Sequence, residues 1–179
     1  YKNRWRRSRC RLMTITVITG TTNGIGLVTA KELAKQGHQL IMLCRNTDAA
    51  QSLTRQINLE TPNSNVTTIP CDLASLESIQ TCIDKLKQEV DGIDLLINNA
   101  GLIAPTDGLS QDGFELSIAV NHIGPFFLTR SLEKLLKGGQ VINLASKAHH
   151  FCNAKELFAE SNFQTSSPYK AFKAYARSK

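Results

Sequence analysis

The sequence lacks any apolar run near the roughly 18 residues that a membrane-spanning helix requires, so we expect no membrane span in this chain. Its five cysteines are odd in number, widely scattered and without a CxxC pair, which argues against a disulfide scaffold and favours a reducing compartment, cytoplasmic or facing the cytosol. The histidines at 122, 149 and 150 have no carboxylate or thiol at metal-ligand spacing, so we expect no metal site. With 179 residues, 41% of them hydrophobic, the chain is too apolar for intrinsic disorder and suits one domain.

Acidic side chains are absent from residues 1–12, which hold six of the 21 basic residues. The other 15 basic side chains balance the 15 acidic ones, so the net charge of +6 belongs to this tail. A basic run can contact nucleic acid or anionic lipid, but this one contains no apolar segment of the kind that a secretory signal needs. Because Met13 stands directly before the first strand-like run, we place residues 1–12 outside the fold and expect no nucleic-acid partner.

Short runs rich in β-branched residues alternate with longer helical patterns from residue 14 onward. The expected strands cover 14–19, 39–44, 66–70, 94–98 and 140–145. The expected helices cover the segment before Gly37, 47–58, 75–90, 114–136 with a kink at Gly124-Pro125, and a last piece from about Tyr169. Parallel strands need long crossovers, and near-continuous apolar strands indicate helices on both faces. Residues 13–179 are therefore predicted to form one doubly wound, mostly parallel α/β sheet of the Rossmann type, with its ligand at the carboxyl ends of the strands.

A glycine-rich turn with the sequence TGTTNGIG follows the first expected strand, with glycines at positions 20, 24 and 26. Glycine permits a tight turn and close approach of the backbone, and it leaves the amides of a helix N-terminus free to bind a phosphate. The GxxxGxG spacing by itself is also compatible with a purely structural turn. Its place after the first strand of a βαβ unit favours a pyrophosphate site.

Two further motifs fall at regular places in the pattern: Asn98-Asn99-Ala100-Gly101 after the fourth expected strand, and Tyr175-Ala-Arg-Ser-Lys179 after the fifth. Together with the glycine-rich turn, they resemble the short-chain dehydrogenase/reductase family. The segments DGFELSIAVNHIGPFFLT and NLASKAHH further resemble its retinol-dehydrogenase-like branch. The resemblance covers residues 14–179 and implies an oxidoreductase that transfers a hydride between a nicotinamide dinucleotide and an alcohol or carbonyl substrate.

The end of the second expected strand carries Arg45, where dinucleotide enzymes that use NAD place an acid for the ribose 2′-hydroxyl. A guanidinium pairs with a 2′-phosphate, so we expect NADP(H) in preference to NAD(H), although an ordinary exposed arginine gives the same pattern. The resemblance assigns Asp72 to the adenine, a role compatible with helix capping, and Asn99 and Ala100 to the adenosine ribose; Asn98 is expected to tie the fourth strand to its neighbour. The residues assigned to the cofactor are Gly20, Thr22, Asn23, Gly24, Ile25, Gly26, Arg45, Asp72, Leu73, Asn99, Ala100, Gly101, Tyr175 and Lys179.

The expected catalytic set contains four residues. Tyr175 and Lys179 are four positions apart and therefore share a helix face. A phenol titrates near pH 10, about three units above neutrality, so chemistry near neutral pH needs a positive charge beside it, which an ammonium supplies. The resemblance assigns Ser146 to a hydrogen bond with the substrate oxygen, and Asn121 to a helix kink and a proton-relay water.

A second pair with the same spacing, Tyr169 and Lys173, competes with this assignment. Six residues separate the two tyrosines, or about 120° around a helix, so only one of them can face the cofactor. The small residues Ala176 and Ser178 beside Tyr175 allow the cofactor to come close, and we therefore choose Tyr175.

The last residue, Lys179, lies within or just beyond the helix expected to carry the catalytic pair. The resemblance implies that family members continue with at least one more helix and two more strands. We therefore expect a sheet that is incomplete at its C-terminal edge, in a fragment with weak activity or none. The substrate stays open, as does the oligomeric state, with a homo-oligomer compatible with the resemblance. The alternative function is a non-catalytic NADP(H)-binding sensor or interaction module, which has no need of Ser146, Tyr175 and Lys179 together.

Overall fold

The computed structural model describes residues 13–61, 65–152 and 168–179. The strands are β1 (Ile15–Thr19), β2 (Gln39–Cys44), β3 (Asn65–Pro70), β4 (Leu95–Asn98) and β5 (Gln140–Asn143). The helices are α1 (Gly24–Lys35), α2 (Thr47–Glu60), α3 (Leu76–Glu89), α4 (Leu116–Ile118), the π-helix η1 (Ala119–Ile123), α5 (Gly124–Ser131), the 3₁₀-helix η2 (Lys147–Phe151) and α7 (Ala171–Ser178). Each expected strand is present with its ends shifted by at most two residues, whereas the expected tail of residues 1–12 lies outside the described residues.

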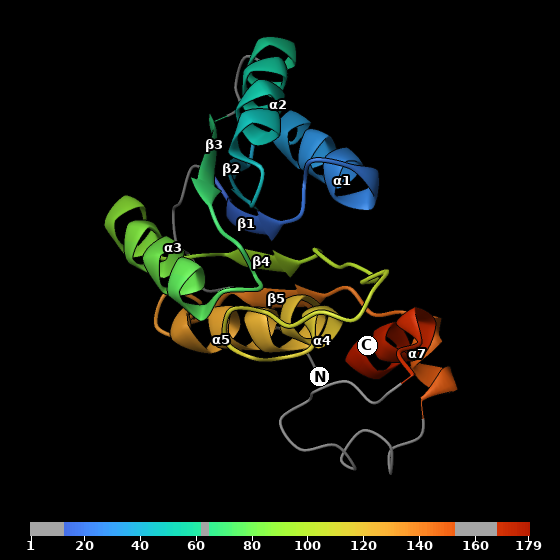
Figure 1. Cartoon of the computed structure of the whole chain (residues 1–179). Helices are drawn as coiled ribbons and strands as arrows, with labels where there is room; N and C mark the ends of the chain where they lie inside the picture. Colours follow the sequence, from blue (N-terminus) through green and yellow to red (C-terminus); the bar gives the residue numbers. More distant parts are fainter. Residues whose placement is uncertain (1–12, 62–64, 153–167) are drawn as a thin grey trace, which may run out of the picture.

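The strands form one parallel sheet in the order β3-β2-β1-β4-β5 (Figure 1). The chain builds outward from β1 to β3 and then returns to place β4 on the other side of β1. Val17 of β1 accordingly pairs with Ile41 of β2 and with Leu96 of β4. This reversal between β1 and β4 confirms the doubly wound fold, and it is where such sheets open a crevice for a ligand.

Helices cover both faces of the sheet (Figure 1), and a separate hydrophobic core lies on each face. On one face, α1 comes close to the strands because it buries the small residues Ala30 and Ala34, and α2 packs beside it. On the other face, α3 buries Ile79, Ile83 and Leu86, whose spacing places them on one side of the helix, next to α5. The two cores hold the strand ends, and with them the loops of the site, in fixed positions.

The long helix expected over residues 114–136 is interrupted earlier than the sequence suggested. The irregular turn is the π-helix η1, which contains Asn121 and ends at Ile123, directly before the Gly124-Pro125 pair where the sequence predicted a kink. Pro125 instead lies in the first turn of α5, where its missing N–H has no helical partner to lose. Asn121 lies within this π-turn, a kind of irregularity that is frequent at functional sites.

Strand β5 differs from the other strands of the described sheet because its side chains are exposed. Val141 is 39% and Ile142 is 49% accessible, whereas Val17 in β1 and Leu96 in β4 are fully buried. Within the residues that the structure describes, no helix combines the length and the apolar character needed to cross a membrane.

Candidate active site

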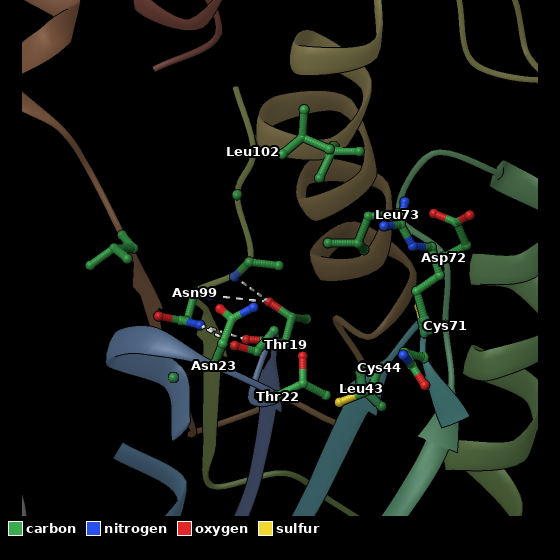
Figure 2. Close-up of a pocket in the computed structure, with 18 of the residues that line it drawn as sticks. Thr19, Thr22, Asn23, Leu43, Cys44, Cys71, Asp72, Leu73, Asn99 and Leu102 are labelled. Carbon is green, nitrogen blue, oxygen red and sulfur yellow. Dashed lines mark hydrogen bonds between the residues drawn. The ribbon is translucent and has the colours of Figure 1, made fainter. Parts of the chain in front are cut away.

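A cavity of about 350 Å³ opens at the carboxyl ends of β1 to β4, above the point where the strand order reverses (Figure 2). Its walls are the turns that follow these strands, together with side chains from η1 and from the end of β5. Its position and size are those of a ligand pocket in a doubly wound sheet. It is lined by Thr19, Gly20, Thr22, Asn23, Ile25, Gly26, Leu43, Cys44, Arg45, Asn46, Cys71, Asp72, Leu73, Asn99, Ala100, Gly101, Leu102, Val120 and Leu144.

The glycine-rich turn brings the backbone of β1 against the turn after β4. Gly20 has a φ of +70°, and a Cβ added there would lie 2.7 Å from the Cα of Ala100. A Cβ added at Gly26 would collide with the carbonyl oxygen of Gly20. At the start of α1, the N-cap residue Asn23 makes no side-chain capping bond, and the first turn carries no acidic residue. The amide end of α1 is therefore left open toward the cavity, which fits the pyrophosphate of a dinucleotide.

Asn99 locks the two turns together. Its side-chain Nδ2 donates to the carbonyl oxygens of Thr19 and Gly20, both at 2.9 Å (Figure 2). The hydroxyl of Thr19 accepts from the backbone N–H groups of Asn99 and Ala100 at 3.1 and 3.0 Å. Asn99 was expected to line the ribose site; it does line the cavity, and its amide also sets the shape of that wall.

Asn98 makes the contact between strands that the sequence suggested. Its Nδ2 donates to Oδ1 of Asn143 in β5 at 2.8 Å and to the hydroxyl of Thr129 in α5 at 3.0 Å. The side chain is buried, so these bonds tie β4 to its neighbour and to the helix beneath it.

The opposite wall of the cavity carries the polar side chains expected at the adenosine end. Arg45 is exposed and stands between Cys44 and Asn46, whose Oδ1 caps α2 by accepting from the N–H of Ala49. Asp72 lines the cavity, and its Oδ1 accepts from the N–H of Ala74 at 2.9 Å. The cap of α3 is Ser75, so the carboxylate of Asp72 shapes the turn before that helix without capping it.

Eleven of the fourteen residues assigned to the cofactor line the cavity; Gly24, Tyr175 and Lys179 do not. Sequence reasoning missed eight lining residues. Most of these are the last residue of a strand or the neighbour of an assigned one, so their place at a strand end was the available signal. Val120 and Leu144 come from distant elements, and no local pattern marks them. The missed residues are Thr19, Leu43, Cys44, Asn46, Cys71, Leu102, Val120 and Leu144.

Asn121 uses its whole side-chain amide to join separate segments. Its Oδ1 accepts from the N–H of Leu102 at 2.8 Å, and its Nδ2 donates to the carbonyl oxygen of the same residue at 2.8 Å. Nδ2 also donates to the hydroxyl of Ser178 in α7 at 2.7 Å. The asparagine therefore fixes both the loop after β4 and the C-terminal end of α7.

Lys179 reaches the same place from α7. Its Nζ donates to the carbonyl oxygen of Leu144, a cavity residue, at 3.1 Å. A Cβ added at Gly101 would lie 3.2 Å from both Oδ1 of Asn121 and Nζ of Lys179, so the two side chains converge on the rim of the cavity. Burial lowers the pKa of the Lys179 ammonium from its ordinary value.

Ser146 and Tyr175 lie on neighbouring elements. Ser146 begins η2, and its Oγ accepts from the N–H of Ala148 at 3.2 Å. Helix α7 packs against η2, where the rings of Phe151 and Phe172 meet edge-on at 5.5 Å. Tyr175, one turn after Phe172, is partly exposed, with its ring 6.5 Å from that phenylalanine.

The competing tyrosine, Tyr169, is engaged elsewhere. Its hydroxyl donates to the carbonyl oxygen of Ala104 at 2.8 Å and lies 3.4 Å from a carboxylate oxygen of Glu115. Burial raises the pKa of the Tyr169 phenol, and the charge of Glu115 adds to this effect. A phenol whose proton is held in this way is a poor general base near neutral pH, which favours the choice of Tyr175.

Across the described ranges, no three histidine, cysteine or acidic side chains gather into a group that could hold a metal ion. The cysteines at 44, 71, 82 and 152 are free thiols.

Over residues 14–157 the chain matches the family described as short chain dehydrogenase. It is 39% identical over 166 residues to Retinol dehydrogenase 13 of Homo sapiens, a match that covers 91% of this chain and 49% of that protein. It is 37% identical to Retinol dehydrogenase 11 of Mus musculus and 35% identical to Polyprenol dehydrogenase of Homo sapiens; both matches cover 92% of this chain, with 52% and 51% of the respective relative. The chain thus spans about half the length of the curated relatives that it matches.

Solved structures share the fold of this chain. An uncharacterized protein from Mycobacterium paratuberculosis superposes with a TM-score of 0.77 at 35% identity, covering 92% of this chain and 57% of its own. A short chain dehydrogenase from Escherichia coli CFT073, complexed with NADPH, shares the fold with a TM-score of 0.70 at 23% identity, over 92% of this chain and 65% of its own. By its family match, its relatives and its sheet, the chain belongs to the short chain dehydrogenase family and is similar to the retinol dehydrogenases within it.

Proposed function

We propose that this chain carries the dinucleotide site and the reactive side chains of an oxidoreductase that uses NADP(H) to interconvert an alcohol and a carbonyl compound. The observation that carries this proposal is the convergence of Lys179 and Asn121 at Gly101, on the rim of a cavity whose glycine-rich wall suits a dinucleotide. When bound, the nicotinamide ring supplies or accepts the hydride.

The side chains of the protein transfer the proton and orient the substrate. Tyr175 gives a proton to the substrate oxygen in reduction and removes it in oxidation. The ammonium of Lys179 stabilises the tyrosinate and has protons to spare beyond the one donated to Leu144. Ser146 accepts a bond from the N–H of Ala148, so its own O–H remains available for the substrate oxygen.

Arg45 supports a preference for NADP(H). It is exposed on the cavity wall directly after β2, where an acidic residue would repel a 2′-phosphate. The guanidinium offers paired donors for such a phosphate. The Escherichia coli protein of the same fold is complexed with NADPH, which agrees with this choice.

The decisive experiment measures turnover in the protein that contains this sequence. The curated relatives are named for retinol and polyprenol, so the probes are all-trans-retinal with NADPH and all-trans-retinol with NADP⁺. We expect Tyr175→Phe to lower kcat by about 100-fold or more without weakening NADPH binding, because it removes only the proton donor. Activity that survives in Tyr175→Phe and disappears in Tyr169→Phe would reverse the assignment of the two tyrosines. Tight NADPH binding without turnover of any alcohol or carbonyl would instead favour the non-catalytic binding module.

A further inference from the structure

A buried polar cluster lies beneath the start of α7 and outside the cofactor cavity. It contains the carboxylate of Glu115, the hydroxyl of Ser117 and the peptide groups of Ala104, none of them more than 1% exposed. The two oxygens of Glu115 accept from the N–H groups of Ser117 and Ile118 at 2.8 and 3.0 Å and so cap α4. The hydroxyl of Ser117 accepts from the N–H of Ala104 at 3.2 Å. This cluster joins the loop after β4 to the helix that leads into η1.

Tyr169 connects this cluster to α7. Its hydroxyl donates to the carbonyl oxygen of Ala104 at 2.8 Å and faces Glu115 at 3.4 Å. A carbonyl and a carboxylate are both acceptors, so the site requires a donor, which a phenol supplies and a phenylalanine ring does not.

Helix α7 also contacts η2 through the edge-on pair of Phe172 and Phe151, and Nζ of Lys179 donates to the carbonyl oxygen of Leu144. Its N-cap residue, Lys170, makes no side-chain capping bond. Its buried residues are Ala174, Ala176 and Ser178, which are too small to interlock deeply with a neighbouring element. Polar contacts at its two ends, from Tyr169 and from Ser178, are therefore well placed to set its orientation.

Both contacts lead to the same short stretch of the loop after β4. Asn121 holds the N–H and carbonyl groups of Leu102 and also bonds Ser178 at the end of α7. Tyr169, which lies two residues before α7, holds the carbonyl of Ala104, two residues further along the loop. This stretch starts directly after Gly101 on the rim of the cavity, and Tyr175 lies on α7 between the two attachments.

We propose that Tyr169 is a positioning residue for the reaction, whose hydrogen bond to Ala104 sets the rotation of α7 and hence the place of the Tyr175 hydroxyl. The inference rests on the proposed function, because it assigns Tyr175 as the proton donor. A small rotation of α7 moves the phenol away from the substrate oxygen, whereas the residues that line the cofactor cavity belong to other elements, and most of them to the turns after β1 to β4. Loss of the Tyr169 hydroxyl therefore acts on the chemical step and not on binding of the dinucleotide.

The test compares single-turnover hydride transfer from NADPH to all-trans-retinal in the parent protein, in Tyr169→Phe and in Thr68→Val. Thr68 is the matched control, because its hydroxyl bonds that of Thr54 at 2.8 Å between β3 and α2, away from α7. We expect Tyr169→Phe to lower the transfer rate about tenfold with an unchanged Kd for NADPH, and Thr68→Val to leave both values near those of the parent. Ser117→Ala removes the acceptor for the N–H of Ala104, the residue to which Tyr169 donates, and is therefore expected to lower the rate as well. This variant tests the inference independently if Tyr169→Phe folds poorly.

Three results would overturn the inference. One is a transfer rate in folded Tyr169→Phe equal to that of the parent. Another is a loss of NADPH affinity that matches the loss of rate, because this would indicate general loosening of the fold. An inactive parent would overturn the proposed function together with this inference, whereas either of the first two results in an active parent overturns the inference alone.

Discussion

The side-chain amide of Asn121 donates a hydrogen bond of 2.7 Å to the hydroxyl of Ser178, across 57 positions of the sequence. The hydroxyl of Ser178 in turn donates to the backbone carbonyl oxygen of Tyr175, also at 2.7 Å. A continuous chain of hydrogen bonds thus runs from the π-turn of η1 to the backbone of the residue proposed to carry the proton. The π-turn has a physical role in this arrangement, because it contains the asparagine from which the chain starts.

We expect Asn121→Ala to lower the free energy of unfolding by about 2–3 kcal/mol, since it removes three hydrogen bonds worth roughly 1 kcal/mol each. Asn121→Asp keeps the acceptor for the N–H of Leu102, so its free energy of unfolding is expected to lie between those of the parent and of Asn121→Ala. Urea denaturation monitored by circular dichroism measures the difference. The control is Asn46→Ala, which removes one exposed capping bond and is expected to cost about 1 kcal/mol. Equal losses in Asn121→Ala and Asn46→Ala would contradict the role of Asn121 as a junction.

We expect Gly26→Ala to weaken NADPH binding by tenfold or more, roughly the effect of 1.4 kcal/mol. A methyl group at this position collides with the carbonyl of Gly20 and the amide of Asn99, so the glycine-rich turn has to move away from its present shape. The matched control is Gly108→Ala, where a Cβ meets nothing within 4 Å and the affinity for NADPH is expected to stay the same. Isothermal titration with NADPH measures both variants. Unchanged affinity in Gly26→Ala would show that the dinucleotide does not use this turn.

The parts of the fold that the sequence predicted correctly are those set by local patterns. The five strands follow from short β-branched runs, and the turn at Gly37 follows from its position after the apolar pattern of α1 and is confirmed by a φ of +81°. The π-turn over Ala119–Ile123 was not predicted, because its form depends on how the side chain of Asn121 meets the loop after β4, a contact between distant segments. The same reason explains why Leu144 was missed as a cavity residue: its place depends on β5 lying beside β4.

In the candidate site, too, local patterns identified some residues, whereas contacts between distant segments determine the others. Motif spacing identified Gly20, Asn99 and the other residues of the strand-end turns, because carboxyl ends of parallel strands meet at one edge of a sheet. The role of Tyr169 was not available from the sequence, where it was only a second tyrosine at the right spacing. Its partners, Glu115 and Ala104, lie 54 and 65 positions away, and no local periodicity points to them.

The lowered pKa of Lys179 has a consequence for stability at alkaline pH. Above this lowered pKa and up to about pH 10.4, the unfolded chain binds a proton that the folded chain has released, so the free energy of unfolding rises with pH. The free energy of unfolding of the parent, minus that of Lys179→Met, is therefore expected to increase with pH over this interval and to level off above it. The rise should be small, because the side chain is only partly buried and water screens it. Urea midpoints measured at a series of alkaline pH values give the curve.

Lys35 provides a control, because its pKa is shifted in the opposite direction to that of Lys179. Its hydrogen bond to Glu32 at 2.7 Å raises the pKa of this exposed ammonium above its ordinary value. The stabilising contribution of the pair is therefore present below the ordinary lysine pKa and is lost as pH rises through the raised one. The difference between the parent and Lys35→Met should accordingly shrink at the highest pH values. A curve for Lys179→Met with the same downward slope would contradict burial as the cause of its shift.

Arg45→Asp is expected to reverse the preference between the two dinucleotides. A guanidinium that pairs with the 2′-phosphate contributes roughly 1.5–3 kcal/mol, and a carboxylate in its place repels the phosphate, so the Kd for NADPH should rise by at least about tenfold. NADH carries a 2′-hydroxyl there, which a carboxylate accepts as a hydrogen-bond donor, so its Kd should stay constant or fall. The matched control is Arg55→Asp, which makes the same charge change on α2 at a residue that donates to the hydroxyl of Ser52 and does not line the cavity. Fluorescence titration of both dinucleotides against the parent and both variants decides the matter, and a parent that binds NADH more tightly than NADPH would rule out this role for Arg45.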